Sequence, residues 1–143
     1  MYNYRVMKKF KFFLIAIALM FGMGVKAQDV YDSKGSVCGK IESNGTVRDR
    51  NGNCIGKFDS DGTVRNNNGS SIGKIERDGT MRNGYGSNIG RIDNDGTVRD
   101  GNGRSIGKID NDGTVRNGNG SSIGKAKDIS KTWAAAYFFF FFK

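Results

Sequence analysis

Proline and histidine are both absent from the 143 residues, which include only two cysteines and one tryptophan. Without histidine, the chain lacks the usual base of a Ser-His or Cys-His nucleophile pair and a common nitrogen ligand for metals. No other cluster of nucleophiles, bases or ligands departs from the repeat described below. The sequence therefore predicts no enzymatic activity, no catalytic residue, no cofactor and no metal site.

The two cysteines, Cys38 and Cys54, lie one position out of phase in neighbouring repeats. In an ideal strand this offset points their side chains to opposite faces, which disfavours a disulfide unless a local bulge rotates one of them. An oxidising compartment would permit the bond. The sequence leaves their pairing open.

The N-terminus has the pattern of a secretory signal peptide. Positive residues from Arg5 to Lys11 precede an apolar run from Phe12 to Val25, and small residues lead to Ala27. A retained anchor helix is the alternative, but the run is shorter than the ~20 residues that a bilayer core requires. We therefore predict a signal peptide over 1–27 and a mature domain over 28–143, exported to a periplasmic, envelope-associated or extracellular location.

Removing residues 1–27 changes the charge of the chain considerably. Five of the 23 Lys and Arg and none of the 14 Asp and Glu lie there, so the formal charge falls from +9 to +4. The remaining charges alternate in sign, without a basic run or an aromatic stacking platform. We therefore expect no nucleic-acid partner.

A seventeen-residue unit repeats from Val30 to about Lys127, and Gly-Thr-Val-Arg returns in nearly every copy. Asn-Gly and Asp-Gly pairs recur between short β-branched runs, which is a strong signal for β-hairpins. Each unit therefore supplies two strands, for example 71–76 and 80–83, and the array supplies about twelve. An open meander would expose two edges, so we predict an all-β, closed, shallow barrel in which the strand near Val30 meets the one near Ile123.

Alternation with a period of two places valine, glycine and one isoleucine column on the inner wall. A second isoleucine column then shares the outer face with a column of cations. Such a ring can lie on an anionic membrane surface. The alternative is a bulge at each Ile-Gly pair that turns the isoleucine into the core. The candidate contact residues are Ile55, Lys57, Ile72, Lys74, Ile89, Arg91, Ile106, Lys108, Ile123 and Lys125.

The acidic residues of the repeats allow two structural interpretations. Glu42, Asp59, Glu76, Asp93 and Asp110 lie two residues from the cations and would partly neutralise them, as a solvated charge ladder. Asp-x-Asp-Gly segments such as 93–96 resemble the start of a calcium loop, but no glutamate stands at the twelfth position. Turn formation is the better explanation of these segments.

The C-terminal segment 132–143 is apolar and does not resemble the repeats. A twelve-stranded barrel would enclose a lumen, because about eight strands are already filled by their own side chains. We predict that this segment plugs the barrel, as a helix. The alternative is a tail that inserts into a membrane or binds a partner. The predicted plug residues are Trp133, Tyr137, Phe138, Phe139, Phe140, Phe141 and Phe142.

The aligned columns, the glycine-rich two-stranded unit and the single apolar tail resemble the beta-flower proteins, shallow barrels of hairpin petals. Five Gly-Thr-Val/Met-Arg units make the chain similar to the five-fold type, over about Val30 to Phe142. That architecture is similar to tubby-like barrels, in which a hydrophobic helix threads the barrel and a basic surface meets phosphoinositide head groups. The resemblance implies membrane association but no reaction and no transferable site residues.

Two classes of function follow from the sequence. The first is an exported, non-enzymatic structural or interaction module of the cell envelope, whose partner is an anionic membrane surface or an envelope protein. The second is a soluble secreted binding protein that contacts glycans or a protein through the polar turns 66–70, 83–87 and 100–104. The identity of any small-molecule ligand is not predicted.

Overall fold

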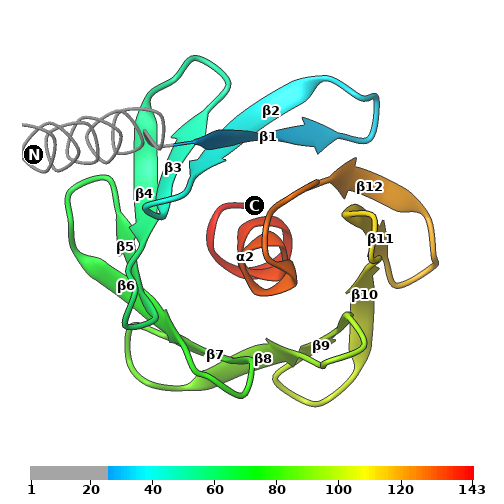
Figure 1. Cartoon of the computed structure of the whole chain (residues 1–143). Coiled ribbons are helices and arrows are strands. Elements are labelled where there is room, and N and C mark those ends of the chain that lie inside the picture. The colour runs from blue at the N-terminus through cyan, green and yellow to red at the C-terminus, as the bar shows by residue number, and fades with distance from the viewer. Residues whose placement is uncertain (1–25) are drawn as a thin grey trace, which may run out of the picture.

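The computed structural model describes residues 26–143, so the predicted signal peptide lies almost entirely outside the described residues. The chain forms a ring of strands around a central C-terminal segment (Figure 1). The twelve strands are β1 Ala27–Asp32, β2 Val37–Glu42, β3 Thr46–Asp49, β4 Cys54–Phe58, β5 Thr63–Asn66, β6 Ser71–Ile75, β7 Thr80–Asn83, β8 Asn88–Ile92, β9 Thr97–Asp100, β10 Ser105–Ile109, β11 Thr114–Asn117 and β12 Ser122–Lys125.

Each strand pairs antiparallel with the next strand in sequence, and β12 pairs with β1 to close the barrel. The closing pair aligns Tyr31 with Lys125 and Asp32 with Gly124. Closure removes both exposed edges of the meander. The predicted closed all-β barrel is therefore confirmed, and the strands follow the repeat to within about a residue.

The tight turns between strands depend on glycine, as in the turn 50–52. Gly52 has φ +86° and its amide donates to the Asp49 carbonyl, while the Asp49 amide donates to the Asn53 carbonyl. In each Asn-Gly or Asp-Gly pair of the turns, the glycine takes a positive φ and the residue before it does not. This pattern is a three-residue hairpin loop that ends in a left-handed glycine.

The inner wall of the barrel is the hydrophobic core. Its largest fully buried side chains are Phe58, Ile41, Met81, Ile109, Val30, Val47, Val64, Val98 and Val115. On each hairpin a residue of the valine column faces one of the isoleucine column, as Val47 faces Ile41. These pairs form a continuous apolar layer around the lumen.

The C-terminal segment fills that lumen. A short α-helix, α2 Lys131–Ala135, continues as a π-helical turn, η1 Ala136–Phe141, at the centre of the ring (Figure 1). Ser130 caps the helix, accepting a hydrogen bond from the Trp133 amide at 3.1 Å. Ala134, Ala135 and Ala136 are fully buried. The predicted plug is therefore present and helical, although its second half is a π-helix.

The two ends of the barrel differ. The helix-entry end carries the turns 43–45, 60–62, 77–79, 94–96 and 111–113 and the segment 127–130, through which the chain enters the lumen. The aromatic end carries the turns 33–36, 50–53, 67–70, 84–87, 101–104 and 118–121. Along β4, Phe58 is nearest the helix-entry end, followed by Gly56 and Ile55. The plug therefore runs from the helix-entry end towards the aromatic end.

Candidate functional site

Six consecutive aromatic side chains of the plug pack against six glycines of the inner wall. Each phenylalanine ring, and the hydroxyl of Tyr137, lies where a β-carbon on its glycine would stand. Successive aromatic residues meet successive hairpins in reverse order around the barrel. The pairs are Tyr137 with Gly39, Phe138 with Gly124, Phe139 with Gly107, Phe140 with Gly90, Phe141 with Gly73 and Phe142 with Gly56.

The glycines are required because the rings approach the backbone itself. A β-carbon at Gly124 would lie 2.5 Å from Phe138 Cε1 and 2.5 Å from the Tyr31 carbonyl oxygen. Real β-carbons essentially never approach other heavy atoms so closely. The glycine column is thus a socket for the aromatic side chains and not only a source of backbone freedom.

The π-helical turn explains how neighbouring residues reach different walls. A π-helix bonds i to i+5, so its turn is wider than that of an α-helix, and it occurs mostly as single turns. Consecutive side chains of such a turn point in successive directions around its axis, which a straight strand cannot achieve. Phe142 meets Phe58 of β4 edge-on at a centroid distance of 5.5 Å, and within the plug Tyr137 meets Phe138 at 5.1 Å.

The isoleucines of the candidate membrane ring do not share the outer face with the cations. The strand register shifts at each of them, so that Val47 faces Gly56 while Arg48 faces Cys54, and Ile55 has no partner. All five are half-buried and pack against the core: Ile55, Ile72, Ile89, Ile106 and Ile123. Of the two alternatives that the sequence left open, the outward position is wrong and the bulge is present, and each bulge turns its isoleucine towards the core.

Together these residues form an apolar surface at the aromatic end. Phe138–Phe142 are half-buried, whereas the alanines behind them are fully buried. The bulge isoleucines and Cys38 surround the rings as a collar. We call the five phenylalanines and this collar the aromatic disc. It includes most of the partly buried apolar side chains that pack against the core in the described residues.

The cations of the predicted ring remain on the outer wall. Lys57, Lys74, Arg91 and Lys108 are exposed and Lys125 is half-exposed. Within residues 26–143, the lysines among them form no ion pair, while Arg91 Nε lies 3.0 Å from Asp93 Oδ1. These cations therefore form a belt around the barrel and cannot all meet one flat surface.

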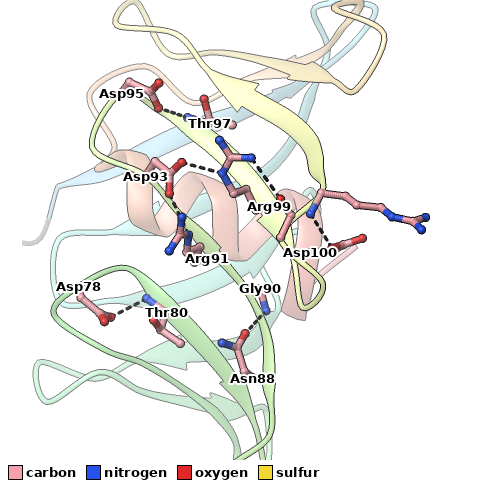
Figure 2. A network of polar contacts seen from close by, with 12 residues as sticks. Asp78, Thr80, Asn88, Gly90, Arg91, Asp93, Asp95, Thr97, Arg99 and Asp100 are labelled. Carbon is pink, nitrogen blue, oxygen red and sulfur yellow. Dashed lines mark hydrogen bonds and ion pairs between the residues drawn. The ribbon is translucent and has the colours of Figure 1, made fainter.

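The acidic residues all pair with a second basic column, and Asp93 alone among the described residues also pairs with the column that the sequence suggested. Glu42 Oε1 accepts from Arg48 Nε at 2.6 Å, and Asp93 lies between Arg91 and Arg99 (Figure 2). The full set of hairpin pairs is Arg48–Glu42, Arg65–Asp59, Arg82–Glu76, Arg99–Asp93 and Arg116–Asp110. These pairs are partly exposed, so each stabilises the fold by about 1 kcal/mol at most.

Acidic and amide side chains organise the turns at both ends. At the aromatic end, Asp100 Oδ1 accepts from the amides of Asn102 and Arg104 at 2.9 and 3.0 Å. At the helix-entry end, Asp95 accepts from the Thr97 amide, and this bond lowers the pKa of the Asp95 carboxyl. No group of three metal-ligating side chains occurs in residues 26–143. The turn interpretation of the Asp-x-Asp-Gly segments therefore agrees with these bonds.

The two cysteines are both free. Cys38 occupies the bulge position of β2 and is half-buried, whereas Cys54 is exposed on β4. Because β3 lies between β2 and β4, two strand spacings of ~4.8 Å separate them, beyond the ~7 Å that a disulfide spans. This fold does not bring the two thiols into bonding range.

Tyr137 is the one plug ring with a hydroxyl, and it lies beside Cys38. Burial raises the pKa of Tyr137 to about 12, and the neighbouring Cys38 adds to the rise. Burial likewise raises the pKa of the Cys38 thiol, partly offset by a hydrogen bond from the Tyr137 hydroxyl. The phenol is therefore favoured in its neutral form within the lumen.

This shift predicts an alkaline loss of stability. The folded pKa of Tyr137 lies above the ordinary value of about 10, so its stabilising effect is complete below pH 10 and declines as pH rises towards 12. Tyr137→Phe keeps the ring and removes the titration. Urea unfolding at several pH values from 8 to about 11 should show a steeper decline in the free energy of unfolding for the unmodified protein. Parallel declines would contradict the buried phenol.

The sequence contained one signal for the socket that could have been recognised. Six inner glycines, one in each repeat, match six consecutive aromatic residues from Tyr137 to Phe142 in number. The predicted plug residues are all placed in or beside the lumen, where Trp133 stacks on Phe58 at 5.3 Å. The ring-to-glycine pairing itself required the structure.

A comparison with protein families matches residues 27–142 to a family described as 5-fold beta-flower protein. The match covers nearly all the described residues. No curated protein and no solved structure shows a significant match to the chain.

Proposed function

Because the chain belongs to the 5-fold beta-flower family, we propose that it is an exported, non-enzymatic interaction module of the cell envelope that associates with anionic membrane surfaces. The observation that carries this proposal is the aromatic disc, an apolar surface left half-exposed at one end of a closed barrel. An apolar patch framed by polar residues is typical of an interaction site. The proposed contact is thus the aromatic end and not the outer belt.

The turns around the disc supply charges suited to an anionic surface. Lys34, Arg50 and Arg104 are exposed on them, and each cation near such a surface contributes about 1 kcal/mol. The acidic residues of the same turns, such as Asp32 and Asp100, have an oxygen that already accepts two backbone amides. The cations are therefore freer to reach outward than the carboxylates.

Tyr85 supports the same orientation. It lies in the turn 84–87 and is 96% exposed, and it is the one large hydrophobic side chain in residues 26–143 that is fully exposed. Tyrosine is enriched at membrane–water interfaces, where its ring and its hydroxyl meet different environments. Its position at the aromatic end agrees with an interfacial contact there.

Export rests on the sequence of residues 1–27, a basic stretch followed by an apolar run and a small-residue exit. The barrel begins at Ala27, so the predicted cleavage would leave the strands almost complete. In the part of the chain that the structure describes, no helix is both long enough and apolar enough to span a bilayer.

Vesicle co-sedimentation tests the membrane contact. The purified protein should sediment with vesicles of phosphatidylglycerol and phosphatidylcholine at low salt, and less so with phosphatidylcholine alone. A triple charge reversal at the aromatic end, Lys34→Glu, Arg50→Glu and Arg104→Glu, should abolish this binding. The matched reversal on the belt, Lys57→Glu, Lys74→Glu and Lys108→Glu, should weaken it only slightly.

Two outcomes would count against the membrane proposal. One is equal loss of binding in both triple variants, which would indicate a nonspecific response to net charge. The other is no binding by the unmodified protein, which would leave the soluble binding protein as the better account. That second candidate is favoured by Asn68, Asn102 and Asn119, which are exposed at the turns and form no side-chain hydrogen bond with the described residues.

A further inference from the structure

A cavity of about 260 Å³ lies at the helix-entry end, beside the segment that enters the lumen. Its apolar lining comes from Ile41, Ile129 and Trp133. Polar side chains, among them Gln28 and Asp128, line it as well. It lies at the opposite end of the barrel from the aromatic disc, so it is independent of the proposed membrane contact.

Trp133 is held in a fixed orientation at this cavity. Its ring stacks on Phe58 with an interplanar angle of 20°, and its amide donates to the Ser130 hydroxyl. The residue is only half-buried, so the part of the indole that Phe58 does not cover is available to a ligand. A rigid aromatic surface lowers the entropy lost on binding.

Asp128 lines this cavity with an unusual backbone conformation and an unpaired carboxylate. It has φ 61°, and within residues 26–143 it is the only non-glycine residue with a positive φ. Such a conformation is uncommon outside glycine, although aspartate adopts it more readily than most residues. Its carboxylate is exposed and forms no hydrogen bond or ion pair with the described residues. The residue also lines a neighbouring cavity of about 360 Å³.

We propose that the cavity at Trp133 binds a neutral pyranose sugar. The apolar C–H face of a pyranose stacks on an indole, and its hydroxyls donate to carboxylate and amide oxygens, here those of Asp128 and Gln28. A pocket with one aromatic wall and a few convergent polar groups suits such a ligand. The unpaired carboxylate of Asp128 disfavours acidic sugars, whereas Glu42, which also lines the cavity, is already paired with Arg48 at 2.6 Å.

Other ligand classes fit less well. A quaternary ammonium ion is usually held by several aromatic faces, and Trp133 is the only aromatic residue among residues 26–143 that lines the cavity. A phosphate group requires cations or clustered amides, but Lys26 is the only cation among the described residues that line the cavity, and the acidic residues Asp128 and Glu42 line it as well. A neutral sugar uses the indole and the carboxylates together.

The single tryptophan of the chain makes the test direct, because all indole fluorescence arises from Trp133. The purified protein, with its N-terminus determined by mass spectrometry, is titrated with methyl β-glucopyranoside, methyl β-galactopyranoside and methyl α-mannopyranoside. We expect at least one to change the emission with a dissociation constant in roughly the millimolar range, as befits a small ligand. Glucuronate is the acidic control and should bind at least about tenfold more weakly.

Two variants distinguish the loss of the Asp128 carboxylate from a change in the fold. Asp128→Gly suits the positive φ and removes the carboxylate, so binding should weaken by about tenfold while circular dichroism stays unchanged. Asp61→Asn, in a turn that does not line the cavity, should bind as the unmodified protein does. The proposal is overturned if none of the three glycosides changes the emission, or if Asp128→Gly binds as tightly as the unmodified protein.

Discussion

Deleting residues 132–143 should abolish the cooperative fold of the barrel. The deletion removes every plug aromatic, and truncating one large buried aromatic to alanine typically costs about 3–5 kcal/mol. Whole domains are stable by only about 5–15 kcal/mol. Even allowing for non-additivity and for the partial exposure of the five phenylalanines, the loss exceeds the stability available. The valine and isoleucine columns would then line an empty or water-filled lumen.

Amide spectra and thermal unfolding measure this effect. The truncated chain should lose amide dispersion and its cooperative melting transition, and it should bind a dye for exposed apolar surface. A matched control that removes only Lys143, which is exposed, should melt within a few degrees of the unmodified protein. A truncated barrel with native dispersion and a similar melting temperature would show that the plug is dispensable.

Gly73→Ala should destabilise the protein by about 2–4 kcal/mol, a large effect for one methyl group. The added β-carbon would clash with the Phe141 ring and would lie 2.5 Å from the Arg82 carbonyl oxygen. Gly84→Ala is the matched control, because its β-carbon would have no neighbour closer than 3.7 Å. This control should change the free energy of unfolding by less than about 1 kcal/mol. Urea unfolding measures both.

Double variants test which ring belongs to which glycine. Adding Phe141→Ala to Gly73→Ala relieves the clash with the ring, so the combined loss should be smaller than the sum by about 1 kcal/mol or more. Relief is incomplete, because the contact with the Arg82 carbonyl remains. Phe139 lies on Gly107, so Phe139→Ala with Gly73→Ala should be additive within about 0.5 kcal/mol. Equal coupling for both pairs would refute the assigned register.

The closed barrel could be predicted because the residues that determine it recur at fixed spacings along the sequence. The Asp-Gly and Asn-Gly spacing set the hairpins, and the Val47 and Ile41 columns set the inner face. The sequence could not decide whether Ile55 points into or out of the barrel. One bulge moves its side chain to the other face of the sheet, and the same sequence is compatible with either register. The sequence therefore indicated the bulge as one alternative but could not distinguish it from regular alternation.

The rest of the candidate site depends on contacts between neighbouring strands and across the lumen. Which acid meets Arg48 is decided by the hairpin register, which pairs Lys40 with Arg48 and brings Glu42 within 2.6 Å. The aromatic sockets depend on the wide turn of η1, and phenylalanine runs carry no signal for a π-helix. The cavity at Trp133 is lined by residues that are far apart in the sequence, so no local sequence pattern predicts it.

The most direct test of the account is a measurement of contacts between glycine α-protons and phenylalanine rings by nuclear Overhauser effects. With protonated phenylalanine and glycine in an otherwise deuterated protein, we expect Gly73 to show contacts with Phe141, and Gly90 with Phe140. Gly107, Gly124 and Gly56 should each show their own ring in the same reverse order. Ring protons that contact only one another, with none near these glycines, would show that the aromatic segment lies outside the barrel.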